Sequence, residues 1–148
     1  MQIREILTLD CTKSAVQCTS KKQALEMISE IAADHSGQSS TELFEDMLSR
    51  EKLGSTGIGN GIAIPHARMK SDKQAIAVLL QCESPIEFDA VDHQPVDLLF
   101  ALLVPEAQSE EGLEALSQMA ITLNDKGVIK QLRDARSDKE LFDVMIFQ

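Results

Sequence analysis

The residue types best suited to chemistry are concentrated in one segment, from Arg50 to Arg68, which contains a single histidine, His66. Four glycines fall within residues 54–61, so the backbone there can approach neighbouring groups closely and present its N–H groups. A histidine side chain has a pKa of about 6.5, so it is largely neutral near pH 7 and can act as a nucleophile. The segment therefore predicts a nucleophilic imidazole at His66.

The other polar groups of this segment suit a phosphoryl group bound to His66. Arg50 supplies a planar cationic fork, and hydroxyl and backbone N–H donors stabilise the same negative charge. We take His66 and Arg50 as the candidate catalytic residues. The candidate phosphoryl-stabilising residues are Thr56, Ser55, Gly59 and Asn60. Spacing alone leaves a second interpretation open, in which His66 is a solvated loop histidine without a chemical role.

The glycines do not form a nucleotide-binding motif. A phosphate-binding Walker loop continues from its last glycine into Lys and then Ser or Thr, whereas Gly61 is followed by Ile62. A dinucleotide-binding loop needs a glycine three residues after Gly59, and that position is again Ile62. Nucleotide binding is therefore not expected.

The remaining candidate ligand residues do not form a metal site. Cys11, Cys18 and Cys82 contain no short-spaced pair, so we expect free, buried thiols. His93 lies among acidic residues, but the pattern is typical of a solvated turn and lacks three converging ligands. We therefore expect neither a metal nor another cofactor.

Hydrophobic periodicity predicts helices and strands on both sides of the His66 segment. Capping boxes at Ser20, Ser39 and Ser137 begin three predicted helices. Ser109 is expected to cap a further helix, and another is expected over residues 128–136. Strands are predicted at residues 13–18, 62–64, 75–81 and 96–104. The glycines of residues 54–61 predict a segment without regular structure. Together these elements predict a single α/β domain over residues 1–148, with a mixed sheet and helices on both faces.

Acidic charge is concentrated in one part of the chain. The net charge is −10, and the 52 residues from 74 to 125 contain ten acidic residues and no Lys or Arg. A protein that binds nucleic acid usually carries the opposite charge, so that function is not expected. We expect part of this acidic block to border the His66 site and to attract a basic partner protein.

Membrane insertion is not expected either. The longest apolar runs, residues 75–80 and 98–104, are far shorter than the roughly 20 residues of a membrane-spanning helix. Glu5 lies where a signal peptide would begin its apolar core. We therefore expect a cytoplasmic protein.

The segment from Gly54 to Arg68 resembles the active-site signature of the enzyme IIA components of the bacterial phosphoenolpyruvate-dependent sugar phosphotransferase system, fructose/mannitol class. The run from Gly59 to His66 is a long and specific match. Residues 50–52, 85–90 and 95–105 match the family as well. The chain is more similar to the stand-alone nitrogen-regulatory enzyme IIA than to a sugar-transport subunit.

This resemblance implies a three-layer α/β/α sandwich with a central mixed β-sheet. It implies that His66 is phosphorylated by a small histidine-containing phosphocarrier protein (HPr- or NPr-like) and that Arg50 helps to hold the phosphoryl group. It also implies regulatory target proteins such as sensor kinases or potassium-transport regulators. One departure is Gly112, which stands where the family usually carries a second histidine close to the first.

Three functions are compatible with these observations. The first is a phosphocarrier that regulates nitrogen- or potassium-related targets through the phosphorylation state of His66. The second is a binding-only regulatory module, which would result if Gly112 impaired phosphotransfer. The third is a sugar-specific transport IIA subunit, which would need separate partner chains because no second domain is fused to it.

Overall fold

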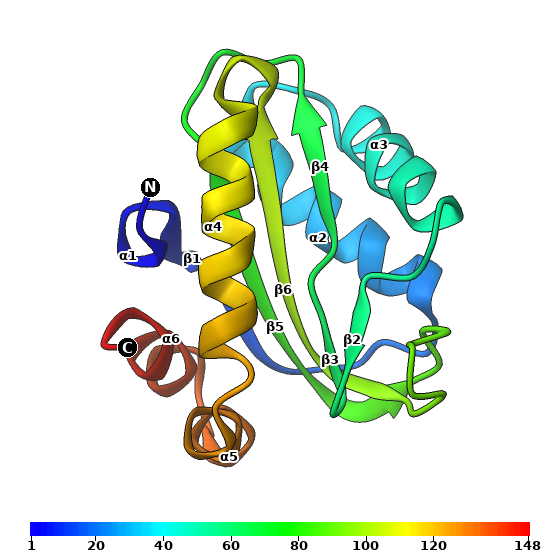
Figure 1. The fold of residues 1–148 in the computed structure, drawn as a ribbon, viewed down its shortest axis with the longest axis vertical. Coiled ribbons are helices and arrows are strands. Elements are labelled where there is room, and N and C mark those ends of the chain that lie inside the picture. Colours follow the sequence, from blue (N-terminus) through cyan, green and yellow to red (C-terminus); the bar gives the residue numbers. More distant parts are fainter.

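A mixed six-stranded sheet forms the centre of the computed structural model, which describes residues 1–148 (Figure 1). The strands are β1 (Leu7–Val16), β2 (Gly57–Gly59), β3 (Ile62–Ala63), β4 (His66–Met69), β5 (Ile76–Ile86) and β6 (Val96–Pro105). Their order is β1-β5-β6-β3-β2, and β4 also pairs with β6. Strand β6 is antiparallel to β5 but parallel to both β3 and β4, so the predicted mixed sheet is confirmed.

Helices cover both faces of this sheet, as expected for an α/β sandwich. They are α1 (Ile3–Ile6), α2 (Lys21–Ser36), α3 (Ser40–Lys52), α4 (Ser109–Thr122), α5 (Lys126–Asp134) and α6 (Asp138–Ile146). Helix α4 crosses one face, while α2 and α3 lie on the other (Figure 1). Side-chain oxygens of Ser20, Ser39 and Ser137 each accept a hydrogen bond from the first turn, which confirms the three predicted helix starts.

The two central strands are buried because helices cover them on both sides. Every residue of β6 is buried except Asp97, which is half-buried, and the first seven residues of β5 are buried as well. Continuous apolar runs are typical of such strands. The two runs at residues 75–81 and 96–104 therefore predicted the middle of the sheet correctly.

The glycine-rich segment differs from its prediction, because part of it is a strand. Gly57–Gly59 forms β2, which pairs antiparallel with β3. A Cβ at Gly57 would lie 2.7 Å from the Cβ of Ala90, so only glycine allows this close approach. Gly61 has a φ of +80° in the turn between the two strands, a conformation that glycine adopts without strain. Here the glycines permit a tight hairpin instead of preventing regular structure.

Two helix boundaries also differ from their predictions. Ser109 is the first residue of α4 and not its N-cap, because the 3-10 helix η1 (Glu106–Gln108) precedes it and the Ser109 hydroxyl donates to the carbonyl of Glu106. Helix α5 begins at Lys126, because the carboxylate of Asp125 accepts hydrogen bonds from two first-turn N–H groups.

Candidate active site

His66 is the first residue of β4 and is half-buried at the edge of β6. The chain does not turn at Pro65 but continues alongside β6. Pro65 has no N–H to donate, yet its carbonyl accepts a hydrogen bond of 2.9 Å from the N–H of Leu102. His66 is therefore held by a sheet and not by a mobile loop.

The two ring nitrogens of His66 have different partners, and these partners define the tautomer. Nδ1 lies 3.0 Å from the carbonyl oxygen of Ile64, which can only accept, so Nδ1 carries the proton and donates. Nε2 lies 3.2 Å from Nε of Arg50, which can only donate, so Nε2 is the unprotonated acceptor. Both contacts agree on one neutral tautomer with its lone pair on Nε2.

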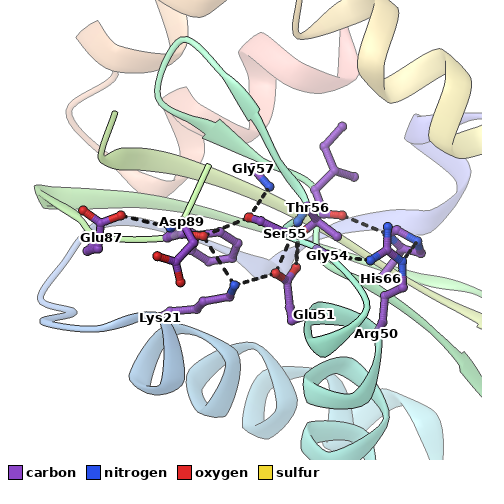
Figure 2. A network of polar contacts seen from close by, with 12 residues as sticks. Lys21, Arg50, Glu51, Gly54, Ser55, Thr56, Gly57, His66, Glu87 and Asp89 are labelled. Atoms are coloured by element: carbon purple, nitrogen blue, oxygen red, sulfur yellow. Dashed lines mark hydrogen bonds and ion pairs between the residues drawn. The ribbon is translucent and has the colours of Figure 1, made fainter. Parts of the chain in front are cut away.

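Arg50 reaches His66 from the last turn of α3 (Figure 2). Its Nη1 donates to the carbonyl oxygen of Gly54 at 2.7 Å, and its Nε donates to the ring of His66. Two of the five N–H groups of the guanidinium therefore fix its orientation, and the others remain for a ligand. The structure thus brings the two candidate catalytic residues into direct contact.

An open hollow of about 410 Å³ adjoins this pair, and we call it the His66 hollow. Its apolar lining consists of Leu53, Ala67, Leu102, Val104, Leu113 and Leu116. Two cationic side chains, Arg50 and Arg68, line it, and no carboxylate does. The expected acidic border of the site is therefore absent from this lining, which is apolar and positively charged.

Gly112 lines the His66 hollow from α4. It is buried, and a Cβ built on it would lie 3.0 Å and 3.1 Å from the two methyl groups of Val104. Gly112 therefore lies in the same hollow as His66, and the side chain of Val104 packs against it.

Ser55 and Thr56 direct their hydroxyl groups away from the His66 hollow. The Thr56 hydroxyl donates to the carboxylate of Glu51, and the Thr56 N–H lies 3.2 Å from the same carboxylate. The Ser55 hydroxyl donates to the carbonyl of Phe88 at 2.8 Å. Neither residue lines the His66 hollow, so the structure does not bring these two predicted donors to the histidine.

Gly59 is the last residue of β2, and Asn60 follows it in the turn to β3. The N–H of Asn60 donates to Asp92 Oδ2 at 3.0 Å, and the Asn60 carbonyl accepts from Arg133. A Cβ on Gly59 would lie 3.4 Å from the same Asp92 oxygen. A carboxylate at this position repels a phosphoryl group. These two residues also lie outside the lining of the His66 hollow.

Sequence reasoning missed a buried acid next to Arg50. Glu51 is 2% exposed at its side chain and forms a 2.7 Å ion pair with Lys21. An acid in the last turn of a helix is disfavoured by the helix dipole, and this position was the available signal. Leu53 and Leu113 were also missed, although they are 85% and 67% exposed beside the site.

This combination of features defines a class of protein. A mixed α/β sandwich holds a neutral histidine with one unprotonated ring nitrogen, which accepts a hydrogen bond from an arginine, at an open apolar hollow. Such an arrangement suits a domain that exchanges an anionic group with another protein.

Comparison with known proteins gives the family. Residues 5–147 match the model for the phosphoenolpyruvate-dependent sugar phosphotransferase system, EIIA 2, and the chain belongs to this family. The nitrogen regulatory protein of Klebsiella oxytoca is 53% identical over 146 residues, which cover 98% of this chain and 90% of that protein. The nitrogen regulatory protein of Pseudomonas aeruginosa is 42% identical over 147 residues, which cover 99% of this chain and 96% of that protein.

A solved structure agrees with this assignment. The crystal structure of nitrogen regulatory protein IIA-Ntr from Neisseria meningitidis superposes with a TM-score of 0.92 at 38% identity. The match covers 97% of this chain and 98% of that one. None of the helices of this chain combines the length and apolarity needed to cross a membrane.

Proposed function

We propose that this chain accepts a phosphoryl group on Nε2 of His66 from a histidine-containing phosphocarrier protein, and that its phosphorylation state regulates target proteins. The observation that carries this proposal is the pair of hydrogen bonds on the His66 ring, which leaves the lone pair on Nε2. Membership of the EIIA family supports a phosphocarrier or regulatory role. The names of the relatives favour regulation over sugar transport.

The proposed transfer is a displacement between two imidazoles. The Nε–H of Arg50 first moves from Nε2 of His66 to an oxygen of the donor's phosphoryl group. The lone pair released on Nε2 then attacks the phosphorus of the donor's phosphohistidine, and an N–P bond forms as the donor's N–P bond breaks. The bonding electrons return to the donor's ring nitrogen, and Nδ1 of His66 keeps its proton throughout. Because one N–P bond replaces another, the chain must supply positioning and charge stabilisation but no metal or nucleotide.

Arg50 supplies the charge stabilisation in this proposal. Its Nε donates to Nε2 of the free histidine, so the guanidinium lies where the oxygens of the transferred group arrive. A fork of N–H groups matches two phosphoryl oxygens at once. The exposed Leu53 and Leu113 beside it offer apolar contact to the donor protein.

A binding-only module is the second candidate, and Gly112 is the observation that favours it. A second imidazole is missing from the His66 hollow, so orientation of the phosphoryl group depends on the arginines that line it. In that case the unphosphorylated protein would bind targets such as sensor kinases or regulators of potassium transport in the cytoplasm.

The test is intact-mass measurement after incubation with phosphoenolpyruvate, enzyme I and the phosphocarrier protein. We expect the wild type to gain the mass of one phosphoryl group and His66→Ala to gain none. His93→Ala is the matched control, because His93 is an exposed histidine outside the site, and it should gain the group as the wild type does. No gain in the wild type would rule out the phosphocarrier and leave the binding module. Onward transfer to a sugar-specific IIB domain would instead favour a transport subunit.

A further inference from the structure

We infer that Glu51, together with Lys21, positions both His66 and Arg50 by anchoring the segment around Thr56. This inference rests on the proposed role of His66 and extends it to residues that do not touch the phosphoryl group. Figure 2 shows the hydrogen bonds that connect these side chains.

The anchor is the Glu51 carboxylate, which is 2% exposed. It lies 2.7 Å from Nζ of Lys21, and it accepts hydrogen bonds from both the N–H and the hydroxyl of Thr56. Lys21 is itself held, because its Nζ lies 3.3 Å from the carbonyl of Phe88 and 4.7 Å from the centre of the Phe88 ring. The carboxylate therefore joins α2, α3 and the segment before β2.

One branch of this network leads from the anchor to Arg50. The N–H of Gly54 donates to the backbone carbonyl of Glu51 at 3.1 Å, while Thr56 is held by the Glu51 side chain. Gly54 itself and Thr56, two residues later, are thus both bonded to Glu51, and these bonds fix the position of Gly54. Its own carbonyl accepts from Nη1 of Arg50 at 2.7 Å, so the position of this carbonyl sets the direction of the guanidinium.

The second branch leads to the histidine. The carbonyl of Thr56 accepts a hydrogen bond of 3.0 Å from the N–H of Ile64. The carbonyl of Ile64 accepts in turn from Nδ1 of His66 at 3.0 Å. The bond that places the proton on Nδ1 therefore depends on a backbone segment that Glu51 holds.

The position of Glu51 is unfavourable unless the residue has such a role. An acid in the last turn of a helix opposes the helix dipole, and burial of a carboxylate costs free energy even when it is paired. A buried ion pair is weak evidence for stability, whereas it can fix one arrangement of the surrounding groups. One branch ends at Arg50 and the other at His66. The arrangement that Glu51 fixes is therefore that of the candidate catalytic pair.

The first measurement is the tautomer of His66 in the unphosphorylated protein, from the 15N chemical shifts of its two ring nitrogens. The wild type is expected to hold its proton on Nδ1. Glu51→Gln keeps the side-chain shape but loses the charge that Lys21 and Thr56 share, so the ring should lose part of this preference. Glu45→Gln is the matched control, because Glu45 is an exposed acid on the same helix, and it should leave the shifts unchanged.

The second measurement is the initial rate of phosphorylation by the phosphocarrier. A shift of the reacting groups reduces a rate by roughly ten- to hundredfold, and we expect a loss in this range for Glu51→Gln. Thr56→Val, which removes the hydroxyl, should cause part of the same loss. Thr56→Ser keeps the hydroxyl and should retain the wild-type rate. A hydroxyl that served stability alone would change the unfolding temperature in Thr56→Val without changing the tautomer.

The outcomes separate this inference from the proposed function. Folded Glu51→Gln and Thr56→Val proteins with the wild-type tautomer and rate would overturn the inference, although His66 would remain the acceptor. A wild type that is never phosphorylated would overturn the proposed function, and the tautomer comparison would still decide the inference. If Glu51→Gln does not fold, the contrast between Thr56→Val and Thr56→Ser decides it.

Discussion

His66 and Arg50 are joined by a hydrogen bond although 16 positions separate them in the sequence. Each also has a second partner, a carbonyl in both cases, so neither side chain is free to turn away. When an anionic group arrives, Arg50 has to move its Nε–H from Nε2 of His66 to an oxygen of that group, while the second partner of each side chain keeps it beside the site.

Arg50→Lys tests whether the planar fork is required. Lysine carries the same charge, but its N–H donors all radiate from one nitrogen on a flexible stem and do not reproduce the planar fork by which Nη1 and Nε of Arg50 reach Gly54 and His66. We expect the phosphorylation rate of both Arg50→Lys and Arg50→Ala to fall by roughly a hundredfold or more. Stopped-time mass spectrometry measures this rate, and Arg136→Ala, an exposed arginine outside the site, is the control. Full activity of Arg50→Lys would show that charge alone is sufficient.

The sequence predicted part of this residue-scale arrangement. The segment and its resemblance to a family identified His66 and Arg50 as candidates, and the structure brings them together. The sequence could not identify the hydrogen-bond acceptors of the Ser55 and Thr56 hydroxyl groups, because a hydroxyl donates to whichever acceptor the fold places near it. For Ser55 that acceptor is the carbonyl of Phe88, which lies 33 positions away.

At the scale of elements, α4 approaches β6 closely at Gly112. Alanine at this position would gain about 1 kcal/mol of helix propensity but would lose about 1–3 kcal/mol by overpacking against Val104. We therefore expect Gly112→Ala to be less stable than the wild type in urea unfolding. In a Val104→Ala background the same substitution should become stabilising, because the methyl groups that it meets are gone. Stabilisation of the wild-type chain by Gly112→Ala would contradict this packing.

The turn between β2 and β3 depends on glycine for a different reason. Gly61 has a φ of +80°, and a Cβ there would lie 2.9 Å from Asp97 Oδ1. We expect Gly61→Ala to lose about 1–3 kcal/mol of unfolding free energy. Gly127→Ala is the comparison, because Gly127 lies in α5 with an ordinary φ. A Cβ there would lie 3.1 Å from Asp125 Oδ1, an exposed side chain that can shift, so the loss should be smaller than for Gly61→Ala. Equal effects of the two substitutions would count against this account of the turn.

Some strands of the sheet could be predicted from the sequence and others could not. Strands β5 and β6 were predictable, since long apolar runs are typical of buried strands. Strands β2 and β4 were not, because three glycine-rich residues and four residues after a proline become extended only through pairing with β3 and β6. Tertiary pairing overrides local preference in both cases.

At the scale of the whole molecule, all three cysteines are buried free thiols, as the sequence predicted. Burial raises the pKa of the Cys82 thiol to about 12, and it also raises the pKa of Cys11 and Cys18. Above pH 9 an unfolded chain loses these protons while the folded chain keeps them, so rising pH favours unfolding.

We therefore expect the unfolding free energy to decrease as the pH rises from 9 towards 12. Cys82→Ala should be less stable at pH 8, because it leaves a small cavity, but its stability should depend less on pH in the alkaline range. Urea unfolding at several pH values measures both effects. The same alkaline slope in the variant and the wild type would contradict a buried, protonated Cys82.

The most direct test of the central claim is to identify which atom carries the phosphoryl group. The protein, labelled with 15N at histidine, is phosphorylated by the phosphocarrier, and the nitrogen coupled to phosphorus is assigned by NMR. We predict phosphorus on Nε2 of His66, with the proton still on Nδ1, because the carbonyl of Ile64 holds that proton. Phosphorus on Nδ1, or on any residue other than His66, would contradict the account.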